Sequence, residues 1–196
     1  MKIEIEKYDP NWVLKFNEIE EVLSECLKQY SPRIEHIGST SVPDLSAKPV
    51  IDIAIGLKSK DWFDEIIELM INSGFIYLSA FNSFVPDRRF FVFLKNKENF
   101  DSEYSELDQI PKEELHANKI ANIHIWFLNS HEWNRHVVFR DYLRVNSVAR
   151  KKYQLLKEEL GRKNWFDGNQ YNLAKNDFIR SEELKALKWF EEKKFS

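Results

Sequence analysis

The stretch IEHIGSTSVP at residues 34–43, followed by KPVIDIAI at residues 48–55, decides the fold of this chain. It predicts a buried strand, a tight Gly-Ser turn that opens a short helix, and a second buried strand that carries one carboxylate, Asp52. Such a layout suits a phosphate-bearing ligand, because the turn offers backbone N–H groups and hydroxyls and a helix start adds a favourable dipole. Asp52 is a candidate ligand for a divalent metal ion beside those phosphates.

Composition predicts a folded globular protein. The chain has 196 residues, of which 43% are hydrophobic and 14% aromatic, enough for a sizeable core within a single domain over residues 1–196. The net charge of −3 gives no general basic field, so we expect no general nucleic-acid surface. A local basic patch is still compatible with this charge.

The single cysteine, Cys26, excludes an intrachain disulfide and a cysteine-based zinc cluster, and it fits a reducing compartment. Residues 1–10 alternate charged and apolar side chains, which is typical of a strand and not of a signal peptide. No apolar run approaches the ~20 residues that span a bilayer. We therefore expect a cytoplasmic protein without a membrane partner; the oligomeric state stays open.

Hydrophobic periodicity predicts strands and helices that alternate first and end in helices. The expected strands cover residues 2–6, 33–37, 49–57, 75–78, 89–94 and 120–128, and the expected helices cover residues 10–30, 60–72, 130–145, 147–160 and 170–190. Residues 95–119 are polar and acidic and predict a long loop with a short helix after Pro111. The fold class is therefore α+β, a mixed β-sheet with packed helices in which residues 130–190 are mainly helical.

Four sequence motifs together resemble the GrpB family of bacterial nucleotidyltransferase-like proteins: IEHIGSTSVP, AKPVIDI, FRDYLR and YNLAK. An apolar residue, Gly-Ser, a gap of 12 residues and then Asp between apolar residues is similar to the nucleotidyltransferase signature. The resemblance runs from Tyr8 to about Ile179 and implies a nucleotidyltransferase-like fold.

Enzymes of that fold place two carboxylates on this strand, two residues apart, and a third on a neighbouring strand, so that they hold two Mg²⁺ ions. The resemblance implies Asp52 as catalytic residue and metal ligand, but Ala54 occupies the second position and cannot bind metal. One Mg²⁺ held through Asp52, water and ligand phosphates stays compatible. His124 lies where the fold often supplies its third acidic ligand; it is either a catalytic or ligand-binding group or a satisfied core histidine.

Small and hydroxyl-bearing residues of the turn are the candidate phosphate contacts: Gly38, Ser39 and Ser41. Glycine permits positive φ and close backbone approach. The alternative is an ordinary turn with capping hydroxyls, but the spacing to Asp52 favours an anion site.

Four basic residues are further candidates for neutralising phosphate. Lys48 precedes the Asp52 strand, and Arg89 lies at the start of the 89–94 strand; each is otherwise a solvated surface charge. Arg140 lies in the family motif FRDYLR and Lys175 lies in the family motif YNLAK, so the resemblance implies that both reach the site. Salt bridges between helices are the alternative.

Three hypotheses follow. The first is Mg²⁺-dependent nucleotidyl transfer from a nucleoside triphosphate to an unidentified acceptor. The second is a catalytically degenerate module that binds a nucleotide or other phosphorylated metabolite, as the alanine at position 54 suggests. The third is an interaction protein whose acidic 95–119 segment docks a partner.

Overall fold

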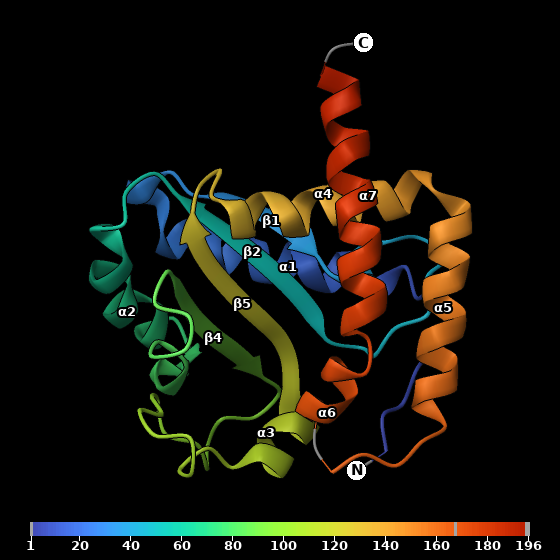
Figure 1. Ribbon diagram of the computed structural model, residues 1–196. Helices are drawn as coiled ribbons and strands as arrows, with labels where there is room; N and C mark the ends of the chain where they lie inside the picture. Colours follow the sequence, from blue (N-terminus) through green and yellow to red (C-terminus); the bar gives the residue numbers. More distant parts are fainter. Residues whose placement is uncertain (1, 167, 195–196) are drawn as a thin grey trace.

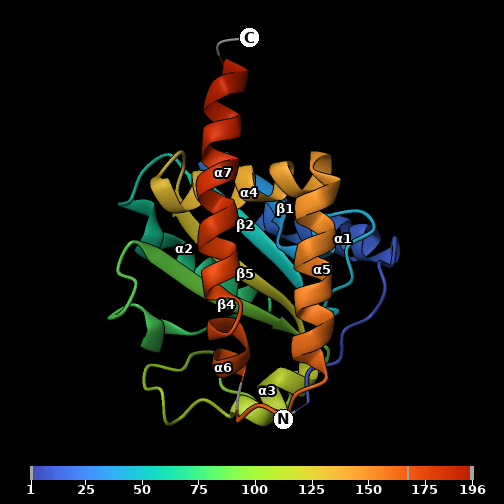
Figure 2. The ribbon, with the colours of Figure 1, turned by 45° about the vertical axis from the view of Figure 1, so that its right-hand side comes forward.

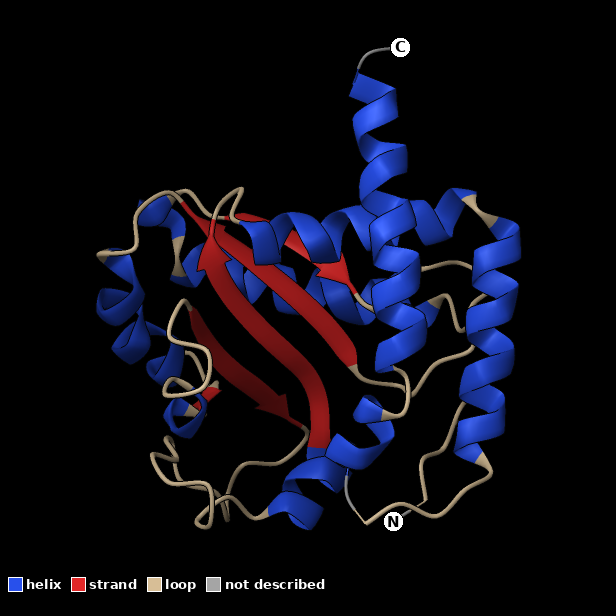
Figure 3. Ribbon diagram, viewed as in Figure 1, coloured by secondary structure: helices blue, strands red, loops and turns tan. Residues whose placement is uncertain are grey.

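The computed structural model describes residues 2–166 and 168–194, and its centre is a five-stranded mixed sheet in the order β1-β2-β5-β4-β3 (Figures 1 and 3). The strands are β1 (Arg33–Ile37), β2 (Ile51–Leu57), β3 (Ile76–Tyr77), β4 (Arg88–Leu94) and β5 (Lys119–Phe127). β2 and β5 run parallel, and the other neighbours are antiparallel. The α+β prediction with a mixed sheet is confirmed.

Helices surround this sheet and dominate the C-terminal part of the chain. They are α1 (Asn11–Cys26), α2 (Trp62–Asn72), α3 (Lys112–Asn118), α4 (His131–Val145), α5 (Ser147–Gly161), α6 (Gly168–Leu173) and α7 (Asn176–Lys194), with 3-10 turns η1 (Lys28–Tyr30), η2 (Ser39–Ser41) and η3 (Ser79–Phe81). The single helix predicted over residues 170–190 is two helices. The edge strand predicted at residues 2–6 is wrong, because Lys2 and Glu6 form only isolated bridges, to Asn164 and Ala47.

One face of the sheet is mostly apolar and packs against α1 and α2. The alternate residues Ile51, Ile53 and Ile55 of β2 are at most 1% exposed and belong to the same core cluster as Trp12 of α1 and Ile66 of α2. In Figure 1, α1 lies behind the sheet and α2 lies at its left edge. Because burying each such side chain stabilises the fold by about 1.5–3 kcal/mol, this layer supplies a large part of the hydrophobic stabilisation.

The opposite face, which carries Asp52, Ala54 and Gly56 on β2, is covered only in part. Trp133 of α4 packs over Ala54 and Trp126 of β5. The remainder of this face is bordered by α3, α6 and the start of α7, with α5 farther out along the side (Figures 1 and 2). This incomplete covering leaves room for a cavity on the Asp52 face.

The segment from Lys95 to Pro111 packs against the sheet, although its polar composition predicts a loop without core contacts. Tyr104 and Ile110 pack with Leu115 of α3 in a third core cluster against β3 and β4. Tyr104 also exchanges backbone hydrogen bonds with the sheet edge, where its N–H donates to the carbonyl of Tyr77 at 2.9 Å. The segment is therefore attached to the sheet and leads into α3, the short helix that the sequence predicts after Pro111.

The C-terminal helix α7 passes α4 and extends beyond the body of the protein (Figure 2). Among the described residues, none of the helices combines the length and the apolar character that crossing a bilayer requires.

Candidate functional site

The Gly-Ser turn brings the end of β1 against the Asp52 carboxylate. Gly38 has φ +71°, and a Cβ placed on it would lie 2.4 Å from Asp52 Oδ2. Both the positive φ and the lack of space require glycine here. The helix that follows is only the three-residue turn η2. A helix of this length has too small a dipole to contribute to the predicted anion site.

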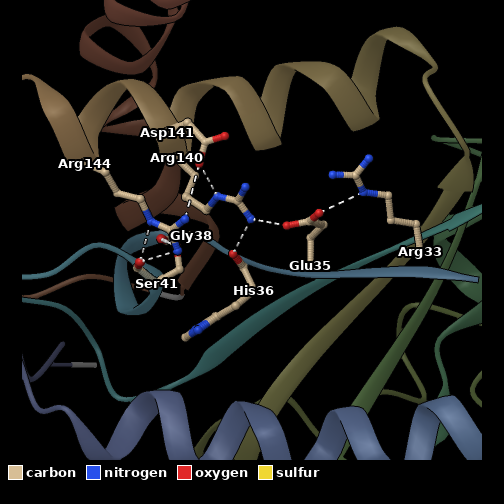
Figure 4. Close-up of polar contacts among 8 residues, drawn as sticks. All are labelled: Arg33, Glu35, His36, Gly38, Ser41, Arg140, Asp141 and Arg144. Carbon is tan, nitrogen blue, oxygen red and sulfur yellow. Dashed lines mark hydrogen bonds and ion pairs between the residues drawn. The ribbon is translucent and has the colours of Figure 1, made fainter.

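Hydrogen bonds fix the shape of this turn (Figure 4). The Ser41 hydroxyl donates to the carbonyl of Gly38 at 2.6 Å, and the Arg144 guanidinium of α4 donates to the carbonyl of Ser41 from Nε at 3.1 Å and Nη2 at 2.9 Å. The Ser41 hydroxyl hydrogen is therefore used within the turn. Ser39 and Thr40 of the same turn line the cavity.

Arg140 has a structural position and does not reach the cavity, so the prediction that it binds phosphate needs correction. Its Nη1 donates to Glu35 Oε2 at 2.6 Å and to the carbonyl of His36 at 3.0 Å, and its Nε donates to Asp141 Oδ1 at 2.8 Å (Figure 4). The side chain is only 7% exposed. Because α4 packs beside β1, the FRDYLR motif stabilises the strand that leads into the turn.

A cavity of about 470 Å³ lies on the Asp52 face of the sheet, within the size range of small-molecule sites. Its described lining residues contain a single carboxylate, Asp52, and cationic side chains from β-strands, helices and connecting segments. These cationic residues are Lys48, Arg88, Lys112, Lys119, Lys157 and Lys175. A concentration of positive charge in a chain with net charge −3 marks this cavity as suited to an anion.

Three of these residues form what we call the lysine cluster: Lys48, Lys119 and Lys175. Burial lowers the pKa of each to about 8 from 10.5, while the negative charge of Asp52 acts in the opposite direction. Repulsion from Lys48 lowers the pKa values of the other two further. Within the described residues, none of the three forms a direct ion pair with Asp52, so their charges remain available to a ligand.

Local contacts orient two of these lysines. Lys48 Nζ lies 3.0 Å from Nδ1 of His116 on α3, whose pKa is lowered to about 4 by burial and the neighbouring lysines, so the imidazole is a neutral acceptor at pH 7. The Lys175 ammonium lies 4.2 Å from the ring centroid of Tyr171. A cation over an aromatic face is held without being neutralised.

Lys157 contributes from α5 and is the most buried of the lysines, with 2% exposure. Its ammonium donates to the carbonyl of Ser46 and lies 4.6 Å from the ring centroid of Tyr153. Burial lowers its pKa well below the usual value. Tyr153 of the same helix lies near the Gly-Ser turn, because Ser39 acts on the pKa of its hydroxyl.

Asp52 is the acid of the site, and Asn122 on the parallel strand β5 holds it. Asn122 Nδ2 donates to Asp52 Oδ1 at 2.8 Å. Burial raises the pKa of Asp52, and this hydrogen bond and the lysine cluster act to lower it. The Oδ1 atom of Asn122 is buried without a hydrogen-bond partner in the described part of the chain, so it can accept a hydrogen bond from a ligand.

The side chains at this site do not fit a two-Mg²⁺ centre. Ala54 is 0% exposed and lies in an apolar cluster with Ile37, Trp126 and Trp133, so the position of a second carboxylate is filled by packing. Within the described residues, no group of three or more His, Cys, Asp or Glu side chains could hold a metal ion. Cations also surround the one carboxylate, which disfavours a divalent ion there.

His124 lines the cavity as a neutral ring. It stacks on Phe90 of β4 at 4.8 Å and on Trp126 at 5.1 Å between ring centroids. Burial, with Arg88 and other cations nearby, lowers its pKa well below 6.5. Such an imidazole is a poor base near neutral pH, so its capacity is for hydrogen bonding and not for proton abstraction.

The cavity thus brings together five of the predicted site residues: Ser39, Lys48, Asp52, His124 and Lys175. Arg89 lies on the opposite face of the sheet, where its guanidinium donates to Asp64 Oδ1 at 2.8 Å. Its neighbour Arg88 lines the cavity instead, which strand alternation relative to Phe90 could have shown.

Sequence reasoning also missed Lys119, Asn122 and Lys157. A lysine on the apolar stripe of α5, between Tyr153 and Leu160, was a usable signal for Lys157. Asn122 shares the face of His124 by alternation. No local signal identified Lys119 as part of the site.

Comparison with known proteins agrees with this architecture. The family model described as GrpB protein matches residues 2–184. The chain belongs to the GrpB family. It is 29% identical over 188 residues to the UPF0157 protein YqkA of Bacillus subtilis, covering 96% of this chain and 48% of YqkA. The chain therefore spans about half the length of that relative.

Solved structures show the same fold. The crystal structure of GrpB from Enterococcus faecalis matches with TM-score 0.75 and 28% identity, covering 95% of this chain and 99% of that one. A structure of Cid1, described as having RNA terminal uridylyl transferase activity, matches with TM-score 0.51 and 15% identity over 81% of this chain and 42% of that one. At that identity, the similarity to Cid1 shows a nucleotidyltransferase-like fold alone.

Proposed function

We propose that this protein binds a nucleotide, or a phosphorylated small molecule built like one, in the cavity on the Asp52 face. The observation that carries the proposal is the charge of the cavity. Its described lining has six lysine or arginine side chains and one carboxylate, although the chain as a whole has net charge −3. Buried ammonium groups that lack direct ion pairs are stabilised when a phosphate group enters.

The rest of the lining favours a ligand with an apolar or aromatic part in addition to phosphate. Five apolar residues that pack together in the third core cluster also line the cavity: Leu78, Phe81, Phe90, Ile110 and Leu115. A nucleoside would place its base against this apolar side while its phosphates contact the lysine cluster. Small-molecule sites commonly combine such an apolar wall with a few orienting polar groups.

Binding, and not transfer, is the activity that the side chains support. Nucleotidyl transfer on this fold depends on two metal ions, and the single carboxylate beside a packed Ala54 does not fit such a centre. Cid1 structures with the UTP analogue UMPNPP show that a protein with a similar fold accepts a nucleotide, and this supports the choice of ligand class.

Isothermal titration calorimetry with nucleoside mono-, di- and triphosphates tests the proposal, on the wild type, on Lys175→Met and on Lys152→Met. Lys152 is an exposed lysine of α5 and serves as the matched control. We expect saturable binding of at least one nucleotide, weakened about tenfold or more by Lys175→Met and unchanged by the control. A ligand at 100 times its Kd should also stabilise the protein by about 2.7 kcal/mol in thermal melts.

Two results would refute the proposal. One is the absence of binding by every nucleotide at millimolar concentration. The other is binding that Lys175→Met leaves unchanged, because the ligand would then occupy another part of the molecule.

A further inference from the structure

The position where a second metal-binding carboxylate would stand is packed with apolar side chains, while ammonium groups occupy the surroundings of the remaining carboxylate. Ala54 lies against Trp126 and Trp133 and is 0% exposed. Beside it, Asp52 Oδ1 accepts a hydrogen bond from Asn122 at 2.8 Å, and Oδ2 faces Gly38 so closely that an added Cβ would lie at 2.4 Å. Asp52 is the single carboxylate of the described cavity lining, so the protein offers a divalent ion only one acidic side chain here.

The lysine cluster supplies positive charge at the place where the metal ions would otherwise supply it. The charges of Lys175, Lys119 and Lys48 all act on Asp52. They come from three separate parts of the chain: the approach to β2, the start of β5, and the connection between α6 and α7. Three ammonium groups can hydrogen-bond directly to the oxygens of a diphosphate or triphosphate and offset much of its negative charge.

From this arrangement, and resting on the proposed nucleotide site, we infer that the ligand binds as the metal-free polyphosphate, with its phosphates directly on Lys48, Lys119 and Lys175. Asp52 acts on these lysines and not on a metal ion. It stabilises their protonated forms while the site is empty, and it repels the incoming phosphates. Where the lysines stay protonated, removing the repulsion from Asp52 should tighten binding; if Asp52 instead held a metal ion, removing its charge should abolish binding.

The first test compares calorimetric titrations of ATP and ADP at pH 7 in EDTA and in excess MgCl₂. We expect binding in EDTA. In MgCl₂ the Kd should be several-fold higher, because Mg²⁺ neutralises the phosphates that the lysines contact. Binding that occurs only in MgCl₂ would overturn the metal-free inference and leave the proposed nucleotide site standing. Absence of binding in both buffers would remove the nucleotide site itself.

The second test is the sign of the Asp52→Asn effect in EDTA. Asparagine keeps the shape of the side chain and can still accept the hydrogen bond from Asn122, and a thermal melt confirms that the variant is folded. We expect a Kd lower by several-fold, on the order of tenfold for one charge at close range. Unchanged or weaker binding would overturn the inference. Lys119→Met should shift Kd in the opposite direction.

Discussion

Lys119→Met should make the ligand-free protein more stable. Burial lowers the pKa of Lys119 to about 8 from 10.5, a difference of about 2.5 units. At 1.36 kcal/mol per unit, the folded protein loses up to about 3 kcal/mol at pH 7 by keeping this ammonium protonated. Methionine has a similar length and no charge, so the substitution removes this cost. For a chain of this size we expect the melting temperature to rise by about 6–12 °C.

The pH dependence distinguishes this mechanism from improved packing. Between pH 8 and pH 10.5 the unfolded chain binds more protons at Lys119 than the folded chain, so the stability contributed by this residue rises with pH in that window. The gain in free energy of unfolding that Lys119→Met gives over the wild type should therefore be largest below pH 8. It should fall below about 1 kcal/mol by pH 10.

Urea denaturation of both proteins at pH 7 and pH 10 measures the difference. Lys95→Met is the matched control, because Lys95 follows β4 next to the Leu94–Lys119 pair but is exposed. The reasoning is refuted if Lys119→Met destabilises the protein at pH 7, or if its advantage over wild type is the same at both pH values.

Four other substitutions or conditions have defined outcomes. Ala54→Asp should destabilise the protein by about 3–5 kcal/mol in urea denaturation, because it places an unpaired carboxylate in the apolar cluster under α4, and calorimetry should detect no gain of Mg²⁺ binding. Gly38→Ala should cost about 2 kcal/mol or more, because the backbone has φ +71° and the new Cβ would meet Asp52 Oδ2 at 2.4 Å; normal stability would contradict the geometry. Arg144→Ala removes both hydrogen bonds to the carbonyl of Ser41 and should cost about 1–3 kcal/mol while weakening nucleotide binding, which a titration of the folded variant would show. Nucleotide affinity should fall as pH rises through about 8, as the lysine cluster loses protons, and an affinity that stays level to pH 10 would exclude these lysines as the phosphate contacts.

Much of the fold follows from local patterns in the sequence. The predicted strand at residues 33–37 matches β1, and the apolar run of residues 49–57 matches β2 except at its start. Ser130 caps α4 at the start of the helix predicted over residues 130–145, with its hydroxyl accepting from the N–H of Trp133 at 3.3 Å. These elements are determined by periodicity, turn chemistry and capping, which act over a few residues and are visible in a single sequence.

The sequence placed less of the site correctly, because a basic residue has the same local pattern whether it contacts a ligand or a carboxylate. Arg140 and Lys175 both lie in family motifs, yet Arg140 donates a hydrogen bond to Glu35 and Lys175 lines the cavity. Arg88 and Arg89 are adjacent, and only the direction of each side chain from β4 separates a cavity residue from a partner of Asp64. Such assignments depend on partners far away in the sequence.

The sequence by itself determined the membership of the GrpB family, the strand–turn–strand unit around Gly38 and Asp52, and the lack of a second carboxylate at position 54. Only the tertiary structure decided what replaces that carboxylate. It packs Ala54 under Trp133 of α4 and brings Lys48, Lys119 and Lys175 from three separate segments to the cavity beside Asp52. The physical reason is that hydrophobic periodicity is local, whereas the charge of a cavity is a sum over side chains that only the packing of distant segments brings together.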